Sequence, residues 1–110
     1  MANNQILDQL FLALSDPTRR SVLEQLSRQP MQVKEMKQNY PISAPAFTKH
    51  LNVLESAGII ARQSVGRTVE CRLKPGGLDL ATQWLYFYSQ YWTKRLDALE
   101  AILAKNEDEI

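Results

Sequence analysis

Residues 43–58 specify a helix and both of its ends more firmly than any other segment of the chain. Ser43 before Pro45 is typical of a helix start, because a serine oxygen accepts a bond from a free backbone N–H and an early proline sacrifices no helical hydrogen bond. Gly58 supplies a stop signal. The segment therefore predicts a helix that begins near Ala44 and ends at Gly58.

The apolar residues of this helix fall on one side. With Phe47 at 0° and a step of about 100° per residue, Leu51 and Leu54 lie within about 40° of it. The opposite side is polar, small near its start and almost free of acid, so it is suited to a DNA major groove about 12 Å wide. Its members are Pro45, Lys49, Asn52 and Ser56, with Ala46 and Thr48 on the flanks and His50 on the shoulder.

The other elements follow from periodicity, proline and glycine. We expect helices at 6–14, 17–28, 32–40 and 78–105 and two strands at 59–65 and 67–73, joined by a turn at Gly66. The fold class is mainly α with a small β-hairpin. Three helices, of which the last two are joined by a short turn and the last, at 44–58, is followed by a hairpin, predict a helix-turn-helix with an appended wing. Residues 1–110 are expected to form one domain.

Composition narrows the functional classes. With one cysteine, Cys71, and one histidine, the chain has no disulfide or zinc-ligand pattern, and we expect no metal and no cofactor. It also lacks a glycine-rich phosphate loop and paired carboxylates in a recognisable setting, so an enzyme is the weakest hypothesis. Neither a membrane span nor a secretion signal is found, and we expect a cytoplasmic protein.

Charge is unevenly distributed although the net charge is only +1. Residues 44–74 carry five basic and two acidic side chains, whereas residues 75–110 carry three basic and six acidic ones. A basic centre that includes the predicted hairpin tip suits contact with a polyanion.

The last predicted helix carries an apolar stripe along its whole length, widened by aromatic residues. This is more apolar surface than so small a domain needs, and we expect a second copy to cover it together with the first helix. A ligand pocket in the aromatic band is the alternative. The expected dimer contacts are Leu7, Phe11, Leu85, Tyr88, Trp92, Leu96 and Leu99.

Three segments together resemble one family: residues 14–20 (LSDPTRR), 42–54 (ISAPAFTKHLNVL) and 55–60 (ESAGII) are similar to the arsenic-repressor (ArsR) family of winged helix-turn-helix regulators. The resemblance implies a homodimer on an inverted-repeat double-stranded DNA operator, usually repressing. It places Ala46, Thr48, Lys49 and His50 at the reading positions and Arg62, Gly66 and Arg67 at the wing. With Ser43, Pro45 and Asn52 these make up the predicted DNA-binding set.

The sequence departs from metal-sensing members of that family. Residues 31–40 contain no cysteine and the last helix contains no histidine, so no inducer is indicated. Cys71 is expected to be a core residue, and His50 either bonds locally or contacts a phosphate. The rival to DNA binding is a winged-helix module that docks another protein through the aromatic helix.

Overall fold

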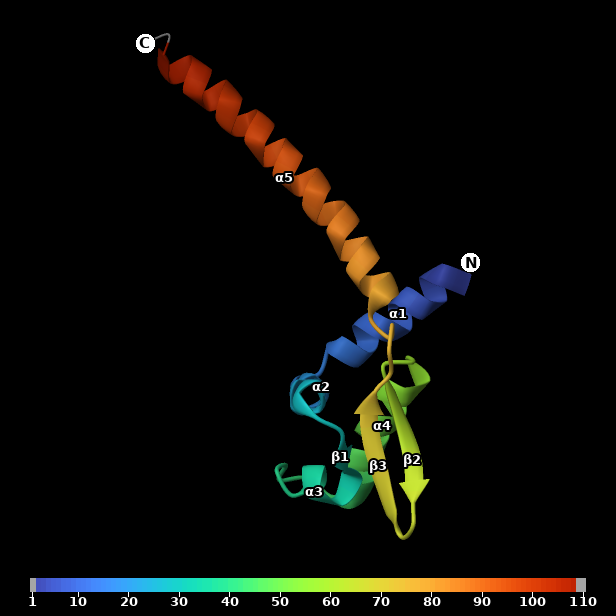
Figure 1. The fold of residues 1–110 in the computed structure, drawn as a ribbon. Coiled ribbons are helices and arrows are strands. Elements are labelled where there is room, and N and C mark those ends of the chain that lie inside the picture. The colour runs from blue at the N-terminus through green and yellow to red at the C-terminus, as the bar shows by residue number, and fades with distance from the viewer. Residues whose placement is uncertain (1, 109–110) are drawn as a thin grey trace. The chain divides into compact units, whose positions relative to one another are not determined.

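The computed structural model describes residues 2–108 and divides into two compact units, residues 1–79 and 80–110. The elements of the N-terminal unit are α1 (Ala2–Leu14), α2 (Pro17–Arg28), β1 (Met31–Gln32), α3 (Val33–Lys37), α4 (Ala44–Ser56), β2 (Ile60–Val65) and β3 (Thr68–Leu73) (Figure 1). Helix α5 (Asp79–Asp108) makes up the C-terminal unit. It continues to Asp108, three residues beyond the expected end at Lys105.

Side chains cap the starts of α2 and α4. The Asp16 carboxylate accepts a hydrogen bond of 3.1 Å from the backbone N–H of Arg19 at the start of α2. The Ser43 hydroxyl accepts one of 3.2 Å from the N–H of Ala46 at the start of α4. Each cap satisfies a backbone donor that has no partner within its own helix.

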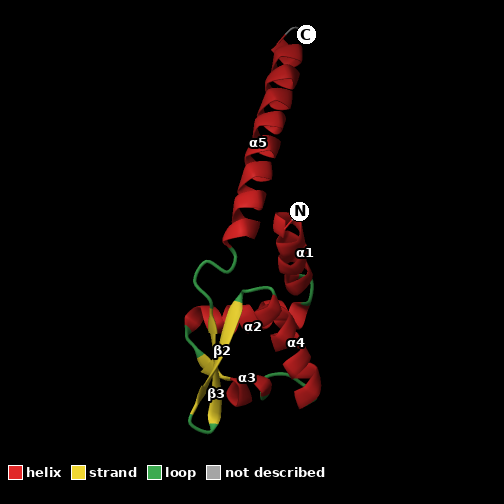
Figure 2. Cartoon of the chain, turned by 90° about the vertical axis from the view of Figure 1, so that its right-hand side faces the viewer, coloured by secondary structure: helices red, strands yellow, loops and turns green. Residues whose placement is uncertain are grey.

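The core of the N-terminal unit forms around the inner side of α4. Phe47, Leu51 and Leu54 are at most 1% exposed, which confirms the predicted stripe. Helices α1 and α2 and strand β2 all contact α4, and Figure 2 shows the helices of this unit with the strands alongside them. The other buried apolar residues include Leu10, Ala13, Val22, Leu26, Met36, Ile59, Ile60 and Cys71. Leu23 of α2 is only half-buried.

The predicted hairpin is present as β2 and β3, and a short strand that the sequence did not predict, β1, extends it to a three-stranded sheet in the order β1-β3-β2. Met31 pairs with Cys71 and Gln32 with Glu70, in antiparallel register. The predicted third helix is correspondingly shorter: it begins at Val33, after β1, and ends at Lys37. A two-residue strand has no periodicity of its own, and its partner lies about 40 residues further along the chain.

The wing turns as the sequence predicts. Val65 pairs with Thr68, which leaves Gly66 and Arg67 as a two-residue turn. Gly66 has a φ of 62° and Arg67 does not have a positive φ, the pattern of a type II′ hairpin with glycine at its first central position. In Figure 1 this turn lies at the free tip of the β2–β3 hairpin.

Helix α5 presents its apolar stripe to solvent in the single chain. Trp92 is 63% exposed and Leu96 54%, and Leu85, Tyr88, Leu99 and Leu103 are exposed as well. Within the helix, the ring of Tyr88 lies 4.5 Å from Trp84 and 5.1 Å from Phe87, centroid to centroid. The aromatic side chains therefore form one continuous band.

Helix α4 ends in a Schellman motif at Gly58. The N–H of Gly58 donates to the carbonyl of Glu55 at 2.9 Å, and the N–H of Ile59 donates to that of Leu54 at 3.1 Å. Gly58 has a φ of 78°, a left-handed conformation that side chains disfavour. No atom lies within 4 Å of where a Cβ would stand, so backbone conformation alone sets the cost of a side chain.

We therefore predict that Gly58→Ala lowers the free energy of unfolding by about 1 to 2 kcal/mol, the cost of a left-handed alanine. Gly58→Asn should cost less, because asparagine tolerates this conformation. Urea denaturation followed by circular dichroism measures both. An alanine variant as stable as the wild type would show that α4 does not end in this geometry.

Candidate nucleic-acid interface

Most of the DNA-binding residues predicted on α4 lie on one open side of that helix. Pro45, Thr48, Lys49 and Asn52 are exposed, as is Ser43 at the cap. Ala46 and His50 are half-buried at the edges of this surface. The surface carries small and polar groups at its N-terminal end, where a helix entering a groove meets base edges.

A cleft of about 460 Å³ separates the N-terminal half of α4 from the wing. It is bounded by α3, α4 and both strands of the hairpin, and its floor includes Val33, Phe47 and Val69. Its charged lining is entirely basic: Lys34, Lys37, Arg62 and Arg67. A basic cleft beside an open polar helix is suited to a phosphate backbone.

Sequence reasoning missed Lys34 and Lys37. They lie three residues apart on α3, so they share one face of that helix. Their spacing was readable, but only the fold shows that this face borders the same cleft as Thr48 and Arg67.

Arg62 is held at the base of the wing rather than displayed at its tip. Its Nε donates to a carboxylate oxygen of Glu55, and its Nη2 donates to the Asn52 Oδ1 at 2.6 Å. Of the three wing residues predicted, Gly66 and Arg67 are at the exposed turn, whereas Arg62 ties β2 to α4. This contact also neutralises Glu55, the one acidic residue of α4.

His50 is bonded locally. Its Nδ1 lies 3.1 Å from the Arg19 Nη1 and 3.7 Å from the Asp16 Oδ2. Arg19 in turn donates through Nε to the Ala13 carbonyl at 2.8 Å and through Nη2 to the Leu12 carbonyl at 2.9 Å. Sequence reasoning gave Arg19 no role, although it belongs to the segment 14–20.

The Asp16 carboxyl sits in the same cluster. Burial raises its pKa, but the backbone N–H of Arg19 and the charges of His50 and Arg19 lower it, and the net pKa lies below its usual value. Asp16 therefore holds its negative charge more firmly in the folded protein than in the unfolded chain.

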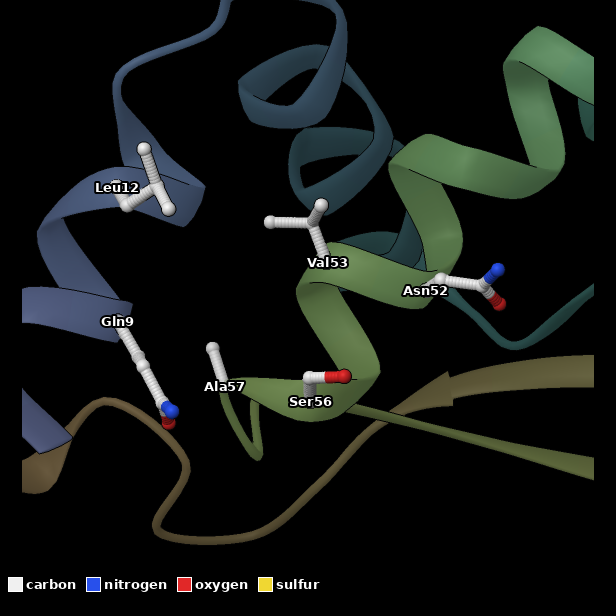
Figure 3. A pocket seen from close by; sticks show the side chains of 6 residues that line it. All are labelled: Gln9, Leu12, Asn52, Val53, Ser56 and Ala57. Atoms are coloured by element: carbon white, nitrogen blue, oxygen red, sulfur yellow. The ribbon is translucent and has the colours of Figure 1, made fainter.

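A second pocket, of about 290 Å³, lies between α1 and the C-terminal half of α4. Figure 3 shows Leu12 of α1 facing Val53 and Ala57 of α4 across it, with Gln9 at one side. No charged residue lines this pocket. Of these two hollows beside α4, only the cleft on the wing side therefore has a basic lining.

Cys71 lies in the core, as expected, and is fully buried. Burial raises the pKa of its thiol to about 11, so the reactive thiolate is scarce at neutral pH. Among residues 2–108, no three His, Cys, Asp or Glu side chains gather closely enough to hold a metal ion. None of the helices in the described part of the chain has the length and apolar character needed to cross a membrane.

The sequence of this chain is similar to a known family and to known transcription regulators. Residues 14–63 match a family described as a helix-turn-helix domain. The HTH-type transcriptional regulator Rv2034 of Mycobacterium tuberculosis is 30% identical over 102 residues, covering 93% of this chain and 92% of the relative. The transcriptional repressor SdpR of Bacillus subtilis is 30% identical over 79 residues, covering 72% and 88%.

Solved structures of ArsR-type regulators are similar to this chain as well. The ArsR family transcriptional regulator RHA00566 is 34% identical with a TM-score of 0.77, covering 82% of this chain and 93% of that one. An ArsR-like transcriptional regulator from Rhodococcus sp. RHA1 is 30% identical with a TM-score of 0.73, covering 93% and 96%.

The Asp16 cap yields a pH-dependent prediction. Asp16→Ala should lower the free energy of unfolding by about 1 kcal/mol at pH 7, the usual value of an N-cap. Asp16→Asn keeps a capping oxygen and removes only the charge. Because the folded pKa is lowered, the charge stabilises the fold above about pH 4 and ceases to do so as the pH falls through the folded pKa.

The stability difference between wild type and Asp16→Asn should therefore shrink in acid, while the alanine variant keeps its deficit from the lost cap. Urea titrations at pH 7 and at about pH 3 measure both. A difference for the asparagine variant that grows as the pH falls would contradict the assignment of the charge.

Proposed function

The chain belongs to the ArsR family of winged helix-turn-helix transcription regulators, and from this membership we propose that it binds an inverted-repeat operator as a homodimer and represses transcription there. The family resemblance of the sequence is thereby confirmed, as is the winged helix-turn-helix fold. The protein is a DNA-binding transcription regulator, and the family consists of regulators rather than enzymes.

The observation that carries the proposal is the pairing of an open polar side on α4 with the basic cleft beside it. In the proposed complex the N-terminal half of α4 enters the major groove, where Thr48 and Lys49 contact base edges or phosphates and Ala46 allows close approach. Arg67 at the wing tip and Lys34 and Lys37 on α3 contact the backbone on either side of the cleft.

Dimerisation is supported by the exposed apolar stripe of α5. Trp92, Leu96 and Leu99 are more than half exposed in the single chain, a state that water disfavours. In the proposed dimer a second copy covers this stripe together with Leu7 and Phe11 of α1. Two α4 helices about 34 Å apart then reach two half-sites, one helical turn of DNA from each other.

Repression is proposed from the Bacillus subtilis relative, which is named as a transcriptional repressor. A dimer bound across an operator that overlaps a promoter excludes the polymerase, so no further domain is needed for this output.

The proposed function predicts how the protein binds DNA. Selection from random duplexes should enrich an inverted repeat, and affinity for that repeat should fall steeply with salt. Lys49→Ala and Arg67→Ala should each weaken binding and reduce the slope of log K against log salt by about 1, with the oligomeric state unchanged. Lys105→Ala removes the same charge from the C-terminal unit and is the matched control.

Fluorescence anisotropy with the selected duplex measures these affinities. Binding that does not depend on salt, together with no enriched repeat, would contradict the proposal and favour the protein-docking module instead.

The proposed dimer predicts how substitutions on α5 change self-association. Trp92→Ala should weaken self-association by about 2 kcal/mol or more, because a large buried aromatic residue is a typical interface anchor. Tyr86→Ala is the control: Tyr86 is 67% exposed but lies about 100° from the Leu85 side of α5, off the stripe. Sedimentation velocity over a range of concentrations measures both; equal association of the two variants would place the interface elsewhere.

A further inference from the structure

One arginine connects the end of α1 to the helix that we propose reads DNA. The Arg19 guanidinium donates to two carbonyls in the last turn of α1, Leu12 at 2.9 Å and Ala13 at 2.8 Å. Its remaining arm, Nη1, lies 3.1 Å from the Nδ1 of His50 on α4. Three bonds from one planar group hold it in a fixed orientation.

The contact with His50 has a chemical consequence. A guanidinium is always charged and can only donate hydrogen bonds. The Nδ1 of His50 must therefore accept, which leaves it without a proton, and the proton of the neutral ring lies on Nε2.

The opposite ring nitrogen is available for a partner. Within residues 2–108 no hydrogen bond from the Nε2 is found, and this atom is not among the buried polar atoms without a partner, so it reaches solvent. His50 is adjacent to Lys49 along α4, at the edge of the open polar side.

We propose that Arg19 is a positioning residue that fixes His50 as the Nε2–H tautomer, and that this N–H donates to a DNA phosphate. The second half of the inference rests on the proposed function, whereas the first half concerns the free protein. Without Arg19 the ring has a different nearest partner: the Asp16 Oδ2 is 3.7 Å from Nδ1, and a carboxylate favours a proton on that nitrogen.

Nuclear magnetic resonance tests the tautomer without DNA, because His50 is the only histidine of the chain. In ¹⁵N-histidine-labelled protein with a neutral ring, the ¹⁵N shifts should show a bare Nδ1 and a protonated Nε2. In Arg19→Ala the population should move toward the Nδ1–H form, because Asp16 becomes the partner. Arg20→Ala is the matched control: the Arg20 guanidinium also bonds a carbonyl of α1, that of Leu14 at 2.8 Å, and leaves the tautomer unchanged.

Variants of His50 test the phosphate contact without disturbing Arg19. The terminal amide of glutamine in His50→Gln lies near the Nε2 position. This variant should therefore retain most of the affinity for the selected duplex. The amide of His50→Asn lies near the Nδ1 position, so it can accept from Arg19 but cannot reach the phosphate. The affinity of His50→Asn for the duplex should fall about tenfold, which corresponds to the loss of one hydrogen bond to a charged group. The affinity of His50→Ala should fall by a similar factor.

A double-mutant cycle closes the test. Arg19→Ala should lose affinity while Arg20→Ala does not, and Arg19→Ala combined with His50→Ala should bind no worse than His50→Ala alone. Additive losses would overturn the inference, as would a wild-type ring protonated on Nδ1 or equal affinities of the glutamine and asparagine variants. If the wild type binds no DNA, the proposed function fails while the tautomer result still stands.

Discussion

The burial of one side of α4 is the constraint on which the rest of the N-terminal unit depends. Phe47, Leu51 and Leu54 are in contact with the core, and this fixes the rotation of the helix about its axis. Because helical residues recur every 100° or so, the same rotation turns Thr48 and Lys49 outward. A polar substitution in the buried stripe would therefore change the orientation of the open polar side of α4 as well as the stability. Tyr40 supports this arrangement from the preceding turn, stacking on Phe47 at 5.4 Å and bonding the Ser21 hydroxyl at 2.9 Å.

The sequence was sufficient to predict features that depend on residues close together along the chain. The cap at Ser43, the glycine at the end of α4 and the turn at Gly66 depend on interactions within a few residues, and the structure contains all of them. The buried stripe of α4 is local in the same sense, since its spacing is the helical period. The proposed role of these residues in DNA binding remains a prediction.

The features that the sequence did not predict depend on contacts between segments that are far apart along the chain. Strand β1 exists only because Met31 and Gln32 find Cys71 and Glu70, and two residues are too few to show alternation. Lys34 and Lys37 are ordinary surface lysines until α3 is placed beside the wing. The family resemblance assigned Arg62 to the wing, but its side chain reaches back to Asn52 and Glu55. In each case the sequence did not show which distant element lies beside the residue in the folded protein.

Two arginines contact α4 at different places along the helix. One pairs with an acidic side chain, and the other contacts His50. Arg62 neutralises Glu55 near the C-terminal end, so the acid does not oppose a polyanion near the polar side. Arg19 contacts the middle of the helix and joins His50 to the last carbonyls of α1. Since Leu7 and Phe11 of α1 belong to the proposed dimer contact, the hydrogen bonds of the Arg19 guanidinium join the helix that carries them to α4.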